Sequence, residues 1–342
     1  MERPNTHLDI LITIPLSDVL IARLKEVSPR LRISVHPARK ADDIPADLWA
    51  RCEVLYTDRV LPAPGQTPRL RWIQFHTAGI DAFADSPLLK DPEIVVSTLS
   101  GAAASQMGEY ALMMLLALGH RLPDMIAAQS KAEWPRDKFE RFQPHELRGS
   151  TVGLVGYGSI ARQVARLLQP FGVEILAAKR DVMHPEDSGY TEDGLGDPGG
   201  DLFQRLYPIQ ALSSMLHECD FVVVAVPHSP ETRNLISAVE IAAMKPGAFL
   251  VDISRGGIVD QAALIQALQD RRLGGAALDV FAEEPLPPTS PLWKLPNILI
   301  SPHIAGSSPH YNERAIEMFA ENLHRYLAGL PVYNRFESQR GY

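Results

Sequence analysis

The sequence predicts an α/β protein built from doubly wound parallel sheets, on the basis of three observations. Short β-branched apolar runs alternate along the chain with segments of helical pattern. The runs are almost continuously apolar, as strands covered by helices on both faces require, rather than alternating between apolar and polar residues. The pattern occurs on a smaller scale in the first hundred residues and again after Gly149, which predicts two sheets of this kind.

The elements follow from this pattern in chain order. Candidate strands lie in the first hundred residues at 8–15, 53–58, 71–77 and 93–98, and after Gly149 at 151–156, 173–178, 220–227, 248–254, 275–281 and 297–303. The apolar segment 110–119 predicts a buried helix, too short to span a bilayer. The segment 310–329 has helical spacing and is expected to pack on the first sheet. Polar residues predict an excursion at 134–150 and an exposed loop at 184–201.

Composition and charge exclude several classes of protein. The 342 residues suffice for two domains of ordinary size. A net charge of −8 argues against a broad nucleic-acid surface, which needs an excess of Lys and Arg. Cys52 and Cys219 lie far apart without metal-ligand spacing, so we expect no disulfide framework, no metal site and a cytoplasmic protein. The apolar run near the N-terminus is too short for a signal peptide or a membrane span, so we expect no membrane partner.

The segment Gly-Tyr-Gly-Ser-Ile-Ala at 156–161 follows a predicted strand and begins a predicted helix. Gly156 permits a tight turn, Gly158 lets a pyrophosphate approach the backbone, and the small Ala161 keeps the helix close to the strand. The free N–H groups and the dipole at the helix start favour an anionic group. This context predicts a dinucleotide site, and the alternative is an ordinary turn of an α/β protein.

Two basic residues, Lys179 and Arg180, end the next predicted strand, where sites that prefer NAD carry an acidic residue. A carboxylate would repel a 2′-phosphate, whereas an ammonium or guanidinium group attracts it. The pair therefore favours NADP(H), with NAD(H) as the alternative. In that alternative the basic side chains point into solvent and Asp181 binds the ribose.

Polar residues of complementary chemistry follow later predicted strands: Arg255, Asp279, Glu284 and His303. Ligands of open α/β sheets lie beyond the carboxyl ends of the strands, so these side chains are expected to converge. Reduction of a carbonyl by hydride requires a proton, which His303 could donate. Glu284 would orient the imidazole and favour its charged form, and Arg255 would bind a carboxylate and polarise the adjacent keto oxygen. Taken singly, each residue is as well explained by an ordinary ion pair or turn.

Five motifs occur in one order along the chain: VGLVGYGSIA (152–161), VVVAVPHSPETRNLI (222–236), LVDISRGGIVD (250–260), ALDVFAEEPLP (277–287) and SPHIAGSS (301–308). Through this series the chain resembles the D-isomer-specific 2-hydroxyacid dehydrogenase family over nearly its whole length, and within it the glyoxylate/hydroxypyruvate reductases. The series is far more specific than any one motif.

The resemblance implies that Arg255 binds the substrate carboxylate, Glu284 supports the histidine and His303 supplies the proton. QFHTAGID at 74–81 resembles the loop whose backbone N–H groups hold the substrate carboxylate, so Ala78 and Gly79 join Arg255 and His303 as substrate-binding residues. Asp279 matches a position near the nicotinamide carboxamide. The expected cofactor-binding residues are Gly156, Tyr157, Gly158, Ser159, Ile160, Lys179, Arg180, Val226, Pro227, Thr232, Ser254, Asp279 and Gly306. For Val226, Pro227 and Thr232 the alternative is ordinary packing at a strand end.

The family fold implies a Rossmann cofactor domain at 104–307, inserted in a smaller flavodoxin-like substrate domain made of 1–103 and 308–342. Members are usually homodimers joined through the cofactor domains, and the dimerisation arm is expected at about 120–149. Trp134 either crosses into the partner's active site or anchors this arm. Pocket residues are expected from loops of the first domain around Tyr56 and Phe75.

The leading hypothesis is an oxidoreductase that transfers a hydride between NADP(H) or NAD(H) and a small 2-keto acid such as glyoxylate or hydroxypyruvate, giving the D-2-hydroxy acid. No motif decides which acid is used or the physiological direction. A second hypothesis is a dinucleotide-sensing binding protein of the same fold, although the tails expected of such a protein are not evident. A methyltransferase would leave the Arg-Glu-His series without a role. Glu284 counts against formate dehydrogenases, whose histidine pairs with Gln.

Several residues depart from the family pattern, Asp252 and Gly108 among them. Asp252 stands where Asn is common, before Arg255, and Gly108 stands where Ala is frequent. Neither departure removes a predicted catalytic group.

Overall fold

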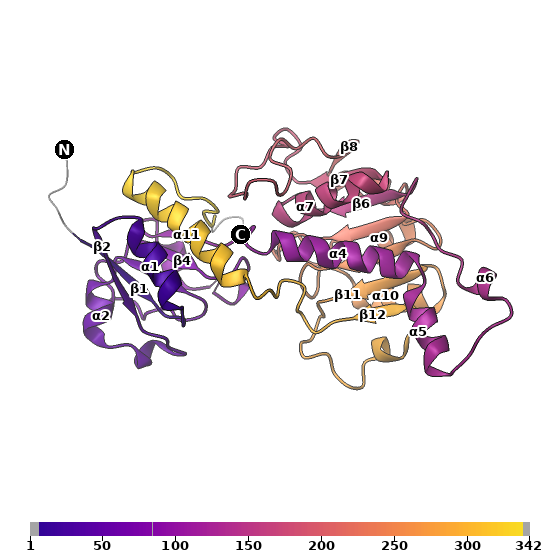
Figure 1. The fold of residues 1–342 in the computed structure, drawn as a ribbon, viewed down its shortest axis with the longest axis horizontal. Helices are drawn as coiled ribbons and strands as arrows, with labels where there is room; N and C mark the ends of the chain where they lie inside the picture. Colours follow the sequence, from indigo (N-terminus) through magenta and orange to yellow (C-terminus); the bar gives the residue numbers. More distant parts are fainter. Residues whose placement is uncertain (1–6, 84, 338–342) are drawn as a thin grey trace. The chain divides into compact units, whose positions relative to one another are not determined.

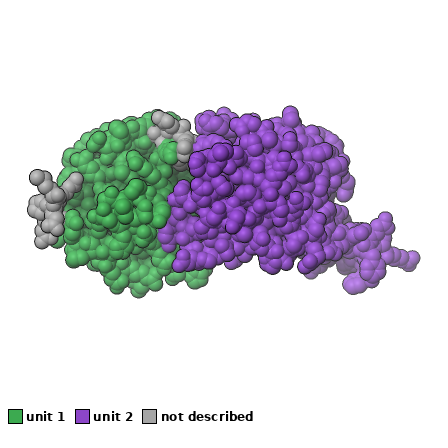
Figure 2. Space-filling model, turned by 90° about the horizontal axis from the view of Figure 1, so that it is seen from above, with its two compact units in different colours: residues 1–102, 308–342 green, residues 103–307 purple. Residues whose placement is uncertain are grey.

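The computed structural model describes residues 7–83 and 85–337. This part of the chain divides into two compact units (Figure 2), each with its own parallel sheet (Figure 1). Unit 1 consists of the chain up to residue 102 and the segment that begins at residue 308, and unit 2 consists of residues 103–307. The second sheet is thus inserted in the sequence of the first, and the predicted fold class is confirmed.

Unit 1 contains a 5-stranded parallel sheet in the order β2-β1-β3-β4-β5. Its strands are β1 (Leu8–Ile12), β2 (Leu31–Val35), β3 (Val54–Thr57), β4 (Trp72–Phe75) and β5 (Val95–Ser97). The four predicted strands of this half are present, but β2 was not predicted. It is an edge strand in which Arg32 and Ser34 interrupt the apolar residues, so it lacks the continuous pattern of a strand buried on both faces.

Helices cover both faces of this sheet. On one face lie α1 (Asp18–Glu26) and α11 (Tyr311–Leu327), where the ring of Phe319 packs 4.5 Å from that of Tyr56 and 5.4 Å from that of Trp72, centroid to centroid. On the other face lie α2 (Ala46–Arg51), α3 (Pro87–Lys90) and the 3₁₀ turns η1 (Ala41–Asp43) and η2 (Asp81–Phe83). The apolar face of α11 therefore returns to the first sheet, as its helical spacing predicted.

Unit 2 contains a 7-stranded parallel sheet in the order β12-β11-β10-β9-β6-β7-β8. Its strands are β6 (Thr151–Val155), β7 (Glu174–Lys179), β8 (Arg205–Pro208), β9 (Phe221–Val224), β10 (Phe249–Asp252), β11 (Gly275–Leu278) and β12 (Ile298–Ile300). The strand order reverses at β6, with β7 on one side and β9 on the other. Such a reversal leaves a crevice beyond the carboxyl ends of the strands, where ligands of α/β proteins bind. Only β8, a short edge strand with exposed ends, was not predicted.

Both faces of this sheet are buried under helices (Figure 1). On one face lie α4 (Ala104–Gly119), α7 (Ser159–Leu168) and the 3₁₀ turn η3 (Gln169–Phe171). On the other lie α8 (Leu212–Leu216), α9 (Ala238–Ala243) and α10 (Gln261–Gln269), with the 3₁₀ turns η4 (Ile209–Ala211) and η5 (Pro291–Lys294). Gly108 lets α4 and α7 approach closely, because a Cβ atom there would lie 2.7 Å from Cγ of Gln163. This contact explains why glycine stands at this position.

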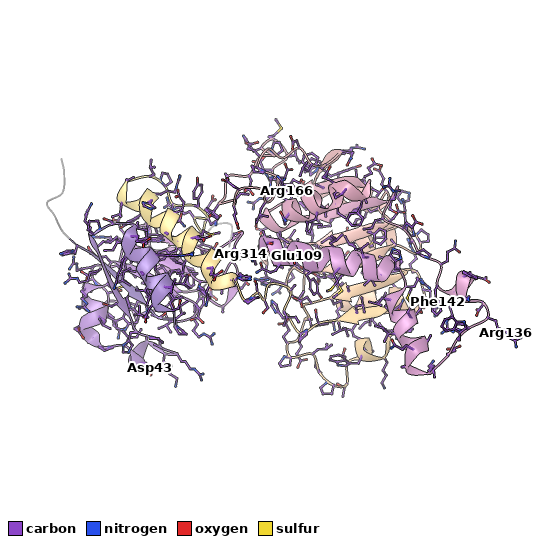
Figure 3. All side chains as sticks on the ribbon, viewed as in Figure 1. Asp43, Glu109, Arg136, Phe142, Arg166 and Arg314 are labelled. Atoms are coloured by element: carbon purple, nitrogen blue, oxygen red, sulfur yellow. The ribbon has the colours of Figure 1, made fainter. Side chains whose placement is uncertain are left out.

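The segment 120–149 extends away from the sheet of unit 2 and carries α5 (Leu122–Ser130) and α6 (Lys138–Arg141). Arg136 and Phe142 mark this extension in Figure 3. Its apolar side chains are unusually exposed, with 83% of the Trp134 surface and 85% of the Phe139 surface accessible. Exposed aromatic residues grouped on a projecting segment indicate a surface that another molecule can cover.

In residues 7–83 and 85–337, no single helix is long and apolar enough to cross a membrane. Among these residues, only α4 and α5 taken together reach the length and apolar composition of a membrane span, and the two helices are bent by 66° relative to each other. Within the same residues, the His, Cys, Asp and Glu side chains form no cluster of three that could hold a metal ion. Cys52 and Cys219 are free thiols, and burial raises the pKa of each to about 12.

Candidate active site

The glycine-rich turn between β6 and α7 has space only for glycine at its first position. Gly156 has φ of +89°, and a Cβ atom there would lie 2.6 Å from Cγ1 of Val226 and 2.9 Å from the carbonyl oxygen of Ala225. At Gly158, in contrast, no atom lies within 4 Å of where a Cβ would be. Because Gly158 directly precedes the free N–H groups of α7, an anionic group can approach the backbone closely here. The turn therefore fits a dinucleotide pyrophosphate.

The other residues of the turn differ in what they can offer a ligand. Tyr157 is 2% exposed, and its hydroxyl donates a hydrogen bond of 2.7 Å to Asp197, so only its backbone is available at the turn. Ser159 and Ile160 are half-buried in the first turn of α7. Ala161 is buried against the sheet, where a larger side chain would push the helix away.

The loop 184–201 was predicted to be exposed, and this prediction is wrong for three residues of its second half. Gly196, Asp197 and Gly200 are buried because the loop folds onto α7. The side chain of Arg162, itself 1% exposed, donates hydrogen bonds to the carbonyl oxygens of Asp197, at 2.5 Å, and Pro185. The Asp197 carboxylate in turn accepts hydrogen bonds from the backbone N–H groups of residues 200–202. The loop is polar in sequence, and its burial depends on a partner 35 residues away.

The two basic residues after β7 have different surroundings. The Lys179 ammonium donates hydrogen bonds to the carbonyl oxygens of His184 and, at 3.5 Å, Glu186, so it holds the start of the loop 184–201. Partial burial, followed by the nearby Arg162, lowers the pKa of Lys179. Arg180 is exposed.

Asp181, the alternative ribose ligand, is engaged within its own turn. Its Oδ2 lies 2.8 Å from Nδ1 of His184, and its Oδ1 accepts a hydrogen bond of 3.0 Å from the N–H of Met183. The hydrogen bond from His184 is the main cause of a lowered pKa of the Asp181 carboxyl.

The loop after β9 contains three further predicted cofactor residues. Val226 is buried against Gly156, and Pro227 is exposed. Thr232 donates from its hydroxyl to the carbonyl oxygen of Pro227, at 2.7 Å, and accepts from the N–H of Ser229, at 2.8 Å. Thr232 thus closes a local turn, so a structural role accounts for its side chain.

Arg255 follows β10 in a turn that requires glycine. Ser254 donates from its N–H and its hydroxyl to Oδ1 of Asp252, which shapes the backbone before the arginine. A Cβ atom on Gly256 would lie 1.8 Å from the carbonyl oxygen of Phe281, so no other residue fits against that segment. The half-buried Arg255 side chain donates a hydrogen bond of 2.8 Å to the Ser254 carbonyl oxygen.

Asp252, which stands where the family commonly has Asn, is 3% exposed. Burial raises the pKa of its carboxyl to about 7, and the neighbouring Asp279 adds to the increase. The hydrogen bonds from Ser254 oppose this shift, but they do not outweigh burial.

We predict that the substitution Asp252→Asn makes stability less dependent on pH. The folded-state pKa lies above the unfolded value, so between about pH 4 and 7 the unfolded chain has released this proton and the folded chain retains it. In that window the wild type loses up to about 1.4 kcal/mol of unfolding free energy per pH unit relative to the variant as pH rises. Denaturant unfolding at several pH values measures the difference. Parallel pH profiles for the two proteins would contradict the prediction.

Glu284 and His303 are paired. Oε2 of Glu284 lies 2.8 Å from Nδ1 of His303, and Oε1 accepts a hydrogen bond of 3.0 Å from the N–H of Phe281. Burial raises the pKa of the Glu284 carboxyl, but the hydrogen bonds from His303 and Phe281 and the nearby Arg255 guanidinium outweigh it, and the net shift is downward. An ionised Glu284 can only accept, so Nδ1 of His303 carries the proton of this bond and Nε2 is left to exchange a proton with a ligand.

The pair is accessible and its backbone is constrained. The side chains of Glu284 and His303 are 35% and 44% exposed. His303 has φ of +53°, a left-handed conformation that residues other than glycine adopt rarely and that often marks a functional site. Unit 2 thus brings Arg255, Glu284 and His303 together after β10, β11 and β12, beyond the carboxyl ends of three adjacent strands.

Asp279 lies directly after β11 and is 2% exposed. Its carboxylate accepts hydrogen bonds from the Ser301 hydroxyl, at 2.6 Å, and from the N–H groups of Ile304 and Ala305, both at 2.8 Å. These donors all belong to the loop that carries His303, and Ser301 was not among the predicted site residues. Gly306, at the end of that loop, is half-buried.

Ala78 and Gly79 belong to unit 1, in the loop after β4. The loop is held by the Thr77 hydroxyl, which donates to the carbonyl oxygen of Gly79 at 2.9 Å, and by the Tyr311 hydroxyl, which donates to that of His76 at 2.8 Å. Burial lowers the pKa of His76, a residue that sequence reasoning missed.

The expectation that loops around Tyr56 and Phe75 supply substrate-pocket residues stays a prediction, and the two residues themselves lie in β3 and β4 rather than in those loops. Both have fully buried side chains in the core of unit 1, on opposite faces of its sheet. The Tyr56 hydroxyl lies 2.6 Å from Nδ1 of His76, so Tyr56 reaches the loop at 76–79 only through that side chain.

Comparisons with known proteins agree with this geometry. Residues 112–305 match the NAD binding domain of the D-isomer specific 2-hydroxyacid dehydrogenases. The chain is 36% identical over 264 residues to a (S)-sulfolactate dehydrogenase from Chromohalobacter salexigens, covering 76% of this chain and 78% of that protein. It is 33% identical over 265 residues to a glyoxylate reductase from Korarchaeum cryptofilum, covering 77% and 74%.

Among solved structures, a D-isomer specific 2-hydroxyacid dehydrogenase from Xanthobacter autotrophicus in complex with NADPH and MES aligns with a TM-score of 0.78 and 26% identity, over 98% of this chain and 100% of the other. The family match spans more than half of the chain, and its motifs lie at the carboxyl ends of the strands of unit 2. The chain therefore belongs to the D-isomer specific 2-hydroxyacid dehydrogenase family of NAD(P)-dependent oxidoreductases.

Proposed function

We propose that the protein reduces a small 2-keto acid to the D-2-hydroxy acid with NADPH, using His303 as the proton donor, Glu284 as its support and Arg255 as the carboxylate ligand. The observation that carries the proposal is the bond between Glu284 and Nδ1 of His303, with the Arg255 guanidinium nearby. All three follow strands of the sheet whose glycine turn fits a dinucleotide.

The residues divide the chemistry as follows. Arg255 binds the substrate carboxylate through its planar fork and polarises the keto oxygen. Bound NADPH supplies the hydride to the carbonyl carbon. Nε2 of His303 gives a proton to the carbonyl oxygen as it gains negative charge, and Glu284 stabilises the imidazolium before transfer. A carbonyl, a hydride and a proton together give the hydroxy acid, and the histidine is reprotonated from solvent.

Unit 2 is proposed to be the dinucleotide domain and unit 1 the substrate domain, in which the backbone N–H groups of Ala78 and Gly79 contribute to carboxylate binding. Support for the first assignment is the glycine turn and the family match at 112–305. Support for the second is the ordered loop at 76–79, which is held from both β3 and α11.

The cofactor preference for NADPH rests on Arg180 more than on Lys179. The exposed Arg180 directly follows β7, and its guanidinium has the charge and planar geometry that a 2′-phosphate attracts. Lys179 donates hydrogen bonds to two carbonyl oxygens of the loop 184–201. A relative of the same fold binds NADPH. Lys179 is proposed to act on the cofactor indirectly, by holding the loop.

The substitution Arg180→Ala is expected to weaken NADPH binding roughly 10- to 100-fold and to change NADH binding little, because a charge-assisted hydrogen bond to the 2′-phosphate is lost. Lys179→Ala, the matched control, is expected to affect both dinucleotides alike. Titration by nucleotide fluorescence measures both variants. Equal losses of NADPH and NADH affinity in Arg180→Ala would show that Arg180 does not read the 2′-phosphate.

A homodimer joined through the segment 120–149 is part of the proposal, supported by the exposed Trp134 and Phe139 side chains on that segment. Sedimentation of the purified protein tests it, and a monomer at micromolar concentration would argue against it.

Oxidation of NADPH in the presence of glyoxylate, hydroxypyruvate and phenylpyruvate tests the reaction itself. Reduction of NADP⁺ in the presence of sulfolactate extends the panel to the acid named for one relative. Turnover of at least one acid is the expected result. Tight NADPH binding without turnover of any of them would favour a binding protein over a reductase.

A further inference from the structure

Two side chains of α4, one helical turn apart, contact both ends of the loop that carries His303. Nε2 of Gln106 donates a hydrogen bond of 2.8 Å to the carbonyl oxygen of Gly306, and the Tyr110 hydroxyl lies 2.5 Å from the Ser301 hydroxyl. Residues four apart on a helix lie on the same face. One face of α4 is therefore directed at this loop, although the partners are about 200 residues apart in sequence.

The neighbouring hydrogen bonds determine which hydroxyl is the donor between Tyr110 and Ser301. The Ser301 hydroxyl donates its only proton to Oδ1 of Asp279, so its oxygen must accept from Tyr110. The tyrosine is thus the donor, consistent with burial raising its pKa to about 12. Tyr110 fixes Ser301, Ser301 is bonded to Asp279, and Asp279 also binds the N–H groups of Ile304 and Ala305.

These bonds surround a strained residue. His303 lies between Ser301 and Ile304 and has the left-handed backbone conformation, which is unfavourable for a residue other than glycine and persists only where neighbouring contacts enforce it. A backbone hydrogen bond of 3.1 Å from the N–H of His303 to the carbonyl oxygen of Ser301 accompanies this conformation. The carboxylate of Asp279, which is 2% exposed, supplies the contacts on the other side of the histidine.

We infer that Tyr110, Ser301 and Asp279 are positioning residues that hold the His303 loop in the geometry needed for proton transfer. The inference rests on the proposed role of His303 as proton donor. None of the three is seen to bond the imidazole itself, so they act through the loop backbone. This role also accounts for a tyrosine on the sheet-facing side of an otherwise mostly apolar helix.

The substitution Tyr110→Phe tests the inference, because it keeps the ring and removes only the hydroxyl. We expect kcat to fall about five- to tenfold, as the loss of one hydrogen bond implies, with the NADPH Kd and the Tm unchanged. The solvent isotope effect on kcat should increase, because proton transfer from a displaced imidazole becomes more limiting. Tyr207→Phe is the matched control. It removes the hydroxyl of a buried tyrosine, which donates to the Glu218 carboxylate at 2.6 Å in the region of β8 and α8, and it should leave kcat unchanged.

Asp279→Asn provides a second test that does not rely on the tyrosine. An Asn side chain keeps one oxygen acceptor but turns an NH₂ group towards the N–H of Ile304 or Ala305, so kcat should fall further, about 100-fold. If the Tm falls in proportion to kcat in both variants, or if Tyr110→Phe loses NADPH affinity in proportion to kcat, the residues are merely structural and the inference is wrong.

His303→Ala separates this inference from the proposed function. If that variant is inactive and Tyr110→Phe has wild-type kcat and isotope effect, the positioning role fails and the proposed reaction stands. If His303→Ala retains full turnover, the proposed function itself fails.

Discussion

Replacing His303 with alanine is expected to lower kcat for 2-keto acid reduction about 100- to 10,000-fold, the range that a positioned general acid contributes. The variant retains the dinucleotide site and Arg255, so NADPH and the keto acid should both still bind. No side chain of the proposed site remains to protonate the carbonyl oxygen. The bond between Glu284 and Nδ1 of His303 orients this imidazole and leaves Nε2 to face a ligand beyond the strand ends of unit 2.

Steady-state kinetics with NADPH and the best keto acid measure this effect, and titration should give an NADPH Kd equal to that of the wild type. His310→Ala is a suitable control. His310 also pairs with a glutamate, with Nδ1 3.1 Å from the Glu313 carboxylate, but the pair lies on the exposed start of α11 in unit 1. The control should retain full turnover. Wild-type kcat in His303→Ala would remove this residue as the proton donor.

Replacing Arg255 with lysine is expected to raise KM for the keto acid roughly 10- to 100-fold, because an ammonium group cannot reproduce two parallel hydrogen bonds to a carboxylate. The charge is conserved, so its attraction for Glu284 is largely retained and the Glu284–His303 pair should persist. A smaller decrease in kcat is expected as well, since the keto oxygen is less well polarised.

The KM for each keto acid, compared with the NADPH Kd, measures where the loss occurs. Arg205→Lys is the control, since Arg205 is exposed at the edge strand β8, where it lies 3.9 Å from the Glu218 carboxylate. The KM of the control should match that of the wild type. An unchanged KM in Arg255→Lys, or an equal loss of NADPH affinity, would indicate that Arg255 supports the turn after β10 rather than the substrate.

Predictions from sequence were most accurate where one local pattern determines one element. Strands such as β6, β9 and β10 are buried on both faces, so a continuous apolar run is both necessary and recognisable. The edge strands β2 and β8 were missed because one side of each is accessible to solvent and polar residues interrupt the run. The order of the motifs likewise located Arg255, Glu284 and His303 near strand ends, because parallel strands all end at the same edge of a sheet.

Predictions failed where a residue depends on a distant partner. The loop 184–201 has the composition of an exposed loop. Hydrogen bonds from the Arg162 guanidinium to the carbonyl oxygens of Asp197 and Pro185 nevertheless hold it against α7.

The sequence by itself determined the fold class, the family, the dinucleotide turn and the identity of the three polar groups near the strand ends. These depend on local patterns and on the direction of parallel strands. Only the tertiary structure decided that Asp279 binds the His303 loop and that Tyr110 of α4 supports it through Ser301, 191 residues away. Hydrogen bonds between side chains so far apart in sequence leave no periodic signal. Their geometry exists only once β12 has joined the sheet of unit 2 and α4 has packed onto that sheet.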